Sequence, residues 1–145
     1  MSTDESPSWS EQRRMAAAVH AAAAERRRAA QTEQARRLVT DFVRQAREQS
    51  IRAEPLVARP YSGRGTYRTP LTGWYLRADR TLAVGTDGEF YVLTVPGSLR
   101  ARFAGARITP QEPPLDVGVG GKDGDSIALD SLLRKRLDAG DDWPA

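Results

Sequence analysis

The chain has 145 residues, of which 39% are hydrophobic, and it carries a formal net charge of +3. Alanine accounts for 21 of the hydrophobic residues, so only 36 larger apolar side chains remain to build a core. Residues 1–54 hold nine of these and residues 71–137 hold 22, so the first third of the chain cannot bury enough surface to fold alone. The composition excludes a second domain and predicts one core in the second half.

Composition also excludes several kinds of site and location. With no cysteine there is no disulfide framework, no thiolate metal site and no cysteine nucleophile. No run of about 18 apolar residues is present, so no membrane span is expected. The segment Met1–Pro7 is acidic and rich in serine, unlike a secretory signal. We therefore expect a cytoplasmic protein, and the excess of alanine and arginine is typical of a GC-rich bacterial genome.

Charge is distributed unevenly along the chain. Residues 55–110 carry eight basic and three acidic groups, whereas residues 111–145 carry four basic and eight acidic groups. A basic middle beside an acidic tail is found in nucleic-acid-binding proteins, and it is also found where two segments attract each other within one chain. The charge pattern leaves both interpretations open.

Residues 9–52 are predicted to form one long helix that follows a disordered N-terminus, residues 1–8. Ser8 and Glu11 have the spacing of a capping box, and neither glycine nor proline occurs from there to Ser50. Alanine, arginine, glutamate and glutamine dominate the segment, and all four favour helix. Such a helix is roughly 60 Å long at 1.5 Å per residue, which is more than a small domain can cover.

The apolar residues divide this helix into two parts. At 100° per residue, one face is shared by Leu38, Val39, Phe42, Val43 and Ala46, whereas Met15 and Val19 point the opposite way. Residues 37–50 are therefore predicted to dock on the core and residues 10–35 to form an exposed extension. A self-standing coiled coil is not predicted, because the heptad positions are interrupted by Glu25, Thr32 and Arg36.

Residues 53–73 contain Pro and Gly in quick succession and are predicted to be a linker. Within it, residues 59–68 carry no acidic group and interleave arginine, which neutralises phosphate, with tyrosine, which stacks on unpaired bases. The alternative is an ordinary connector whose tyrosines pack on the sheet. The candidate nucleic-acid-binding residues of this segment are Arg59, Tyr61, Arg64, Tyr67 and Arg68. Arg37 and Arg44 of the helix are added to them.

The clearest β signal is Asp87-Gly88, which has the sequence of a two-residue hairpin turn between two apolar runs. This turn would pair Val84 with Tyr91 and Leu82 with Leu93. A preceding strand, Trp74 to Arg77, would place Trp74 opposite Val84 and complete a three-stranded antiparallel meander. Phe90 to Val95 is apolar on both faces apart from Thr94, which indicates a central strand.

The rest of the second half completes a small α+β domain, residues 74–140. Residues 98–108 fit either a short helix or a strand. Val117 to Val119 and Ile127 to Leu129 flank a Gly-rich turn and predict a second hairpin. A short helix follows, with Asp130 as N-cap and Gly140 as C-cap, and residues 141–145 form an acidic tail. The predicted fold class is α+β: a long N-terminal helix, a small antiparallel β-meander of three to five strands, and a short C-terminal helix.

No catalytic, metal or cofactor site is predicted. The glycine-rich segment 118–126 departs from a phosphate-binding loop, because Asp116 stands at the place of the first glycine and Asp123 at the place of the hydroxyl residue. The turn carboxylates would be solvated, whereas acid–base catalysis needs a carboxyl in a cleft. His20 is the sole histidine and cannot build a zinc site alone. These features argue against an enzyme.

The mismatch between a long helix and a small core points to protein binding. We expect a non-enzymatic bacterial accessory or adaptor protein that binds another protein, or a second copy of itself, through the N-terminal helix. The candidate partner-binding residues are Trp9, Met15, Val19 and Trp143, although Trp143 can also fold back on the sheet. The alternative function is nucleic-acid binding through the arginine and tyrosine residues of the linker and the helix; no membrane partner is expected.

Overall fold

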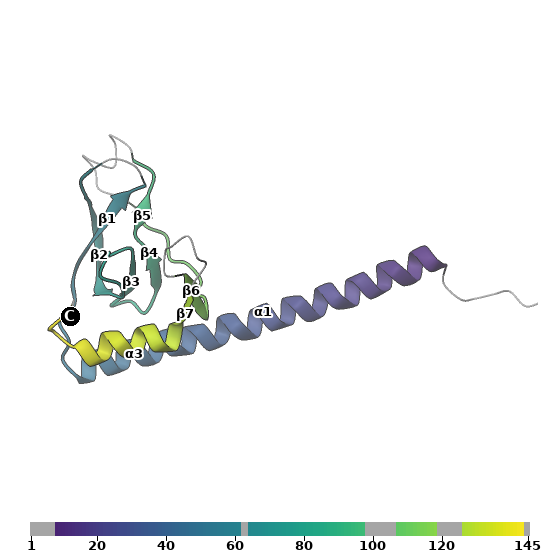
Figure 1. The fold of residues 1–145 in the computed structure, drawn as a ribbon, viewed down its shortest axis with the longest axis horizontal. Coiled ribbons are helices and arrows are strands. Elements are labelled where there is room, and N and C mark those ends of the chain that lie inside the picture. The colour runs from purple at the N-terminus through teal and green to yellow at the C-terminus, as the bar shows by residue number, and fades with distance from the viewer. Residues whose placement is uncertain (1–7, 62–63, 98–106, 119–125, 144–145) are drawn as a thin grey trace, which may run out of the picture.

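The computed structural model describes residues 8–61, 64–97, 107–118 and 126–143, and confirms the α+β class (Figure 1). A long helix carries a five-stranded mixed sheet, a two-stranded hairpin and a short helix that packs beside it. The elements in chain order are α1 (Trp9–Glu48), β1 (Glu54–Pro60), β2 (Tyr67–Tyr75), β3 (Leu82–Gly85), β4 (Phe90–Val92), β5 (Thr94–Val95), β6 (Asp116–Gly118), β7 (Ser126–Ala128) and α3 (Leu129–Ala139).

Helix α1 begins with the predicted capping box, in which Ser8 and Glu11 exchange side-chain and backbone hydrogen bonds. It ends four residues before the predicted end. Ser50 has a φ of 55°, its N–H donates to the carbonyl of Arg47, and the N–H of Ile51 donates to the carbonyl of Ala46. This is a Schellman ending, which usually places glycine where Ser50 stands. Since the chain has serine there, composition gave no stop signal.

The predicted linker, residues 53–73, is wrong as a loop: it forms β1 and most of β2, which pair antiparallel. The pairing register of the two strands shifts between Pro55 and Val57, which marks a β-bulge. Proline is tolerated at such positions, and Pro60 is the last residue of β1. Proline and glycine here mark irregular strands and not a connector.

The five strands have the order β4-β3-β2-β1-β5, so the two outer strands are consecutive pieces of one stretch of chain. Leu93 joins them: its N–H donates to the carbonyl of Thr81, and its carbonyl accepts from the N–H of Arg59. The sheet therefore curls until its two edges meet at Leu93. The prediction of a central strand over Phe90–Val95 is wrong, because β4 and β5 are these two edges.

The β3–β4 hairpin exists, but its predicted register is wrong by one residue. Val84 pairs with Phe90 and Leu82 with Val92. The loop has three residues, Thr86 to Gly88, since Gly85 pairs with Glu89 and Gly88 takes a φ of 83°. Three-residue loops with a left-handed glycine at the third position are a common alternative to the two-residue turn. The predicted pairing of Trp74 with Val84 is confirmed.

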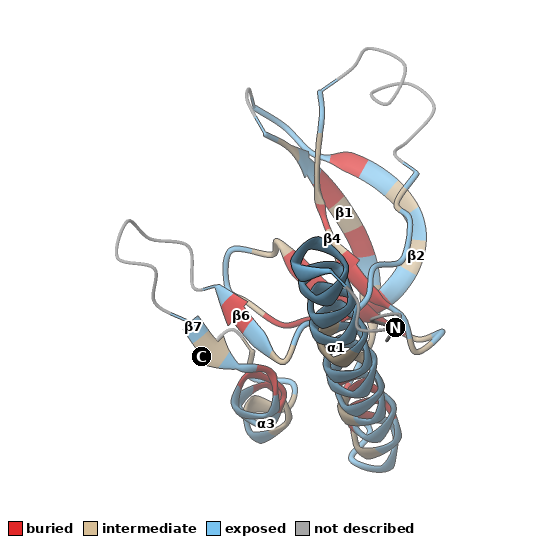
Figure 2. Cartoon of the chain, turned by 90° about the vertical axis from the view of Figure 1, so that its right-hand side faces the viewer, coloured by how far each residue is buried: buried red, intermediate tan, exposed pale blue. Residues whose placement is uncertain are grey.

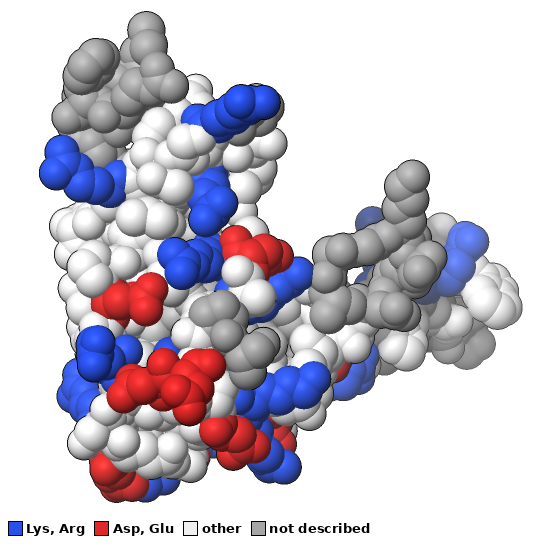
Figure 3. All heavy atoms as spheres, turned by 60° about the vertical axis from the view of Figure 1, so that its left-hand side comes forward, with Lys and Arg blue, Asp and Glu red and all other residues white. Residues whose placement is uncertain are grey.

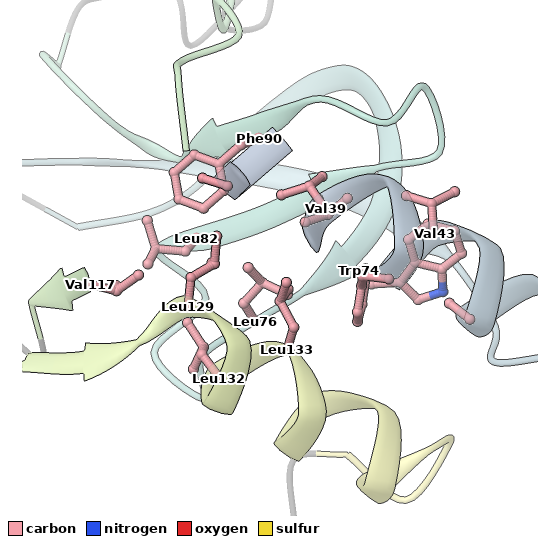
Figure 4. Packing of buried hydrophobic residues seen from close by; sticks show 14 of the residues in the cluster. Val39, Val43, Trp74, Leu76, Leu82, Phe90, Val117, Leu129, Leu132 and Leu133 are labelled. Carbon is pink, nitrogen blue, oxygen red and sulfur yellow. The ribbon is translucent and has the colours of Figure 1, made fainter. Parts of the chain in front are cut away.

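The register determines which side chains face the helices. Phe90, Val84 and Leu82 join Trp74 in the larger core, which packs against α1 and α3 (Figure 4). The ring of Phe42 meets that of Trp74 edge to face at 5.8 Å, and the indole N–H donates to the carbonyl of Ile51. A smaller cluster lies on the other face of the sheet, inside the curl, and consists of Leu56, Tyr75, Ala83, Tyr91 and Leu93.

The C-terminal elements follow the prediction with one correction. Val117 pairs with Ile127 in the second hairpin. Helix α3 begins at Leu129 with Ala128 as N-cap and no side-chain cap, so Asp130 lies in the first turn, where it pairs with Arg134. Gly140 is the C-cap as predicted. The ambiguous segment 98–108 lies largely outside the described residues, as does most of the Gly-rich turn 118–126.

Candidate functional site

The first candidate site is the N-terminal part of α1, residues 9–27, which we call the arm. It extends as a single helix beyond the described residues that follow α1, which we call the body (Figure 1). No arm residue is buried, and only Ala23 and Ala24 are half-buried (Figure 2). Three large apolar side chains lie open to solvent: Trp9 is 78% exposed, Met15 60% and Val19 65%.

Contact between α1 and the body starts near Arg28. A shallow groove between helix and body is lined by Arg28, Gln31 and Thr32 on α1 and by residues 113–116 on the other side. Ala35 is fully buried, two residues before the predicted docking segment. The exposed extension is therefore shorter than residues 10–35, and sequence reasoning missed Ala35 because alanine carries little apolar signal.

An ion pair holds α1 where it meets the body. The guanidinium of Arg36 binds the carboxylate of Glu112, which precedes the buried Pro113. This hydrogen bond is the main cause that lowers the pKa of Glu112 and raises the pKa of Arg36. Both side chains are more than half exposed, so the pair positions the helix more than it stabilises the fold. The sequence offers no signal for a contact between residues so far apart.

The arm presents different side chains on its two sides. Along α1, the buried residues Val39, Phe42 and Val43 mark the side that faces the body, as predicted. Met15 and Val19, four residues apart, share the opposite side of the helix. The apolar pair on the arm therefore does not continue the docking face, and none of the described residues buries it.

Local interactions are sufficient to keep the arm helical. Its docked continuation removes the cost of nucleation, and alanine has the highest helix propensity. The capping box closes the N-terminus, and Glu25 pairs with Arg28 at 2.6 Å. Trp9, Met15 and Val19 are not buried by any described residue, so the arm does not need them to remain helical.

Trp143, the fourth predicted partner-binding residue, lies against the body and not free of it. Its ring stacks on Tyr75 at 6.2 Å between centroids, and Arg136 places its guanidinium over the same ring. Arg136 is buried and donates to the carbonyls of Tyr75 and Gly140. Sequence reasoning missed Arg136, although it lies three and four residues after the buried Leu133 and Leu132, on the inward side of α3.

The second candidate site is on β1 and β2, where the structure brings three of the predicted nucleic-acid residues together. Arg59, Tyr61 and Arg68 are exposed, and Tyr61 is 71% exposed. Tyr67 is separated from them: it is only 7% exposed and packs with Ala58 on the other face. Arg64 is exposed on the connection between the two strands.

The two predicted arginines of the helix lie elsewhere. Arg37 and Arg44 are exposed on α1, and Arg44 forms ion pairs with Asp41 and Glu48 at 3.6 and 3.3 Å. They do not join the arginines of β1 and β2 in one surface. Arg44 has the pattern of a solvated, ion-paired helix face.

The described residues contain no arrangement that stands out as a catalytic centre. No group of three potential ligands among them is placed to hold a metal ion. The hydroxyl of Tyr91 donates a hydrogen bond to Asp87 at 2.5 Å. Burial is the main cause that raises the pKa of Tyr91, and this hydrogen bond is the second cause. A phenol kept protonated in this way holds the β3–β4 loop by a hydrogen bond, and it cannot accept a proton as a general base.

Within the described part of the chain, no helix is long and apolar enough to cross a membrane. No protein family, no curated protein and no solved structure matches this chain.

Proposed function

We propose that this protein is a non-enzymatic accessory or adaptor protein that binds another protein through its helical arm. The observation that carries the proposal is the position of Met15 and Val19: both are exposed, on a part of α1 in which no residue is buried, opposite the docking side. An apolar pair that no described residue buries is explained by a surface supplied by a partner.

The chemistry of the arm describes the partner. Apolar residues four apart on one helix face fit a hydrophobic groove, which is a common mode of helix recognition. Residues 9–27 carry four arginines and two glutamates, a formal charge of +2. The groove should therefore be apolar with an acidic rim. A second copy of the arm is less suited, because two arms of like charge repel each other.

The proposal retains the expectation of a bacterial, cytoplasmic protein, which rests on composition. It assigns the body the role of a platform that holds the arm at a fixed place. The ion pair of Arg36 with Glu112 supports that role, because it ties the start of the docked segment to the body.

Site-specific crosslinking in cells tests the proposal. A photoreactive phenylalanine analogue at Val19 should give a discrete adduct with another protein, and Met15→Asp in the same chain should abolish it. The matched control carries the analogue at Thr72, which is exposed on β2 of the body. An adduct of the chain with itself would identify a second copy as the partner. If Val19 gives no adduct, or only those that Thr72 gives, the proposed function is wrong.

A further inference from the structure

A basic and aromatic surface lies on the body, independent of the arm. In β1 the side chains alternate: Leu56 and Ala58 are buried on the inner face, so Val57 and Arg59 lie on the outer face. In β2, Tyr67 is buried beside Ala58, and Arg68 pairs with Val57. Paired residues of neighbouring strands point to the same side. Arg59 and Arg68 therefore share the outer face of the sheet.

Tyr61 continues the same face beyond the end of β1. The N–H groups of Arg59 and Tyr61 donate to the carbonyls of Leu93 and Val95, so the bonding to β5 runs through Tyr61 with a period of two. Side chains two residues apart in an extended strand lie about 7 Å apart on one side. The exposed phenol ring thus stands next to Arg59, on a backbone fixed by hydrogen bonds.

This surface, which we call the Arg-Tyr face, consists of Arg59, Tyr61 and Arg68. None of its arginines has a carboxylate partner among the described residues, whereas Arg36, Arg44 and Arg134 each have one. In Figure 3 the upper end of the molecule, where β1 leads into β2, displays basic side chains and no acidic ones among the residues described. Among the described residues, no carboxylate forms an ion pair with this positive charge.

We propose that the Arg-Tyr face binds single-stranded nucleic acid. Guanidinium groups bind phosphates, and an exposed aromatic ring next to them offers a platform on which an unpaired base stacks. A duplex hides its bases and would leave Tyr61 unused. A protein partner for the same face would need apolar area around Tyr61, where the chain has arginine. The proposal does not depend on the arm and stands or falls separately from it.

Fluorescence anisotropy with the full chain tests the proposal, with 12-nucleotide poly(U) RNA and poly(dT) DNA as probes at 50 and 200 mM salt. With the two arginines of the Arg-Tyr face on phosphates, the logarithm of affinity should fall with a slope of about −1.4 against the logarithm of salt, which is roughly a 7-fold loss. Binding of either probe supports the proposal. The ratio of the two affinities reports on the 2′-hydroxyl and the thymine methyl group together.

Variants separate stacking from charge. Tyr61→Ala should weaken binding roughly 5- to 150-fold, and Tyr61→Phe should restore it, because stacking needs only the ring. Arg68→Ala should reduce the salt slope by about 0.7. Arg134→Ala removes the same charge from α3 and should change affinity less than twofold. All these side chains are exposed, so the fold should be retained.

Three results would overturn the proposal. The first is no binding of either probe at 50 mM salt with 100 μM protein. The second is equal loss of affinity in Arg68→Ala and Arg134→Ala, which would mean that only net charge matters. The third is Tyr61-dependent binding to vesicles with 30% phosphatidylserine and none to the nucleic acids, which would make the face a membrane contact.

Discussion

The guanidinium of Arg136 lies over the ring of Trp143, with 4.8 Å between its central carbon and the ring centroid. The same ring stacks on Tyr75, whose carbonyl accepts a hydrogen bond from Arg136 at 2.9 Å. Burial is the main cause that lowers the pKa of Arg136. The last described residues of the chain are therefore part of the body.

Removing the Arg136 guanidinium should destabilise the protein. Arg136→Leu keeps much of the volume, yet it leaves the carbonyl of Tyr75 without its donor in a buried place. We expect the free energy of unfolding in urea to fall by about 1–3 kcal/mol. Arg134→Leu, on the exposed side of the same helix, should change it by less than about 0.5 kcal/mol. Equal effects of the two variants would contradict this role.

Stability should depend on Tyr91 at alkaline pH. The pKa of Tyr91 is raised in the folded protein above its ordinary value of 10.0, so the folded state keeps a proton that the unfolded chain loses. The stabilising contribution is complete below pH 10 and is lost as the pH rises above it. Urea unfolding between pH 8 and 11.5 should show a steeper decline for the natural chain than for Tyr91→Phe. Parallel curves above pH 10 would refute the prediction.

Gly73 should be intolerant of a side chain. A Cβ atom there would lie 2.1 Å from the carbonyl oxygen of Val84 on the paired strand. Gly73→Ala should lower the free energy of unfolding by about 1–3 kcal/mol, because β2 and β3 would have to separate. Gly118→Ala, where a Cβ meets nothing within 4 Å, is the control and should be neutral. Urea unfolding of both variants measures the two changes, and an equal free energy of unfolding for Gly73→Ala and Gly118→Ala would contradict the prediction.

The two parts of α1 should respond differently to truncation. Phe42 is buried against Trp74, so Phe42→Ala should lower the free energy of unfolding by about 3–5 kcal/mol. Met15 contacts no core, so Met15→Ala should change it by less than about 0.5 kcal/mol. A large loss with Met15→Ala would mean that the arm folds against the body in solution.

Much of the fold could be predicted from local patterns. The capping box, the docking side of α1 and the second hairpin follow from cap chemistry and from periods of 3.6 and 2 residues. The register of β3 and β4 could not, because Asp87-Gly88 fits a two-residue turn as well as the end of a three-residue loop. A shift of one residue moved Phe90 toward α1 and Tyr91 into the curl.

The sheet closure and the sites depended on contacts distant in sequence. The proline and glycine residues of β1 and β2 resemble those of a loop in the sequence. The β-bulge between these strands appears only when the two strands are paired. The pairing of β5 with β1, which fixes Tyr61, joins residues more than thirty positions apart. Sequence could indicate that residues 59–68 are basic and aromatic, but only strand pairing separates the exposed Tyr61 from the buried Tyr67.

Urea unfolding of a shortened chain, residues 28–145, tests most directly the claim that the arm serves a partner and not the fold. The cut removes Trp9, Met15 and Val19 and keeps Ala35. We expect a free energy of unfolding within about 1 kcal/mol of the full chain, whereas a deeper cut that begins at residue 39 and removes Ala35 and Leu38 should cost several kcal/mol. If the chain of residues 28–145 is itself unfolded, or loses as much as the deeper cut, the arm is a structural element and the proposed function is wrong.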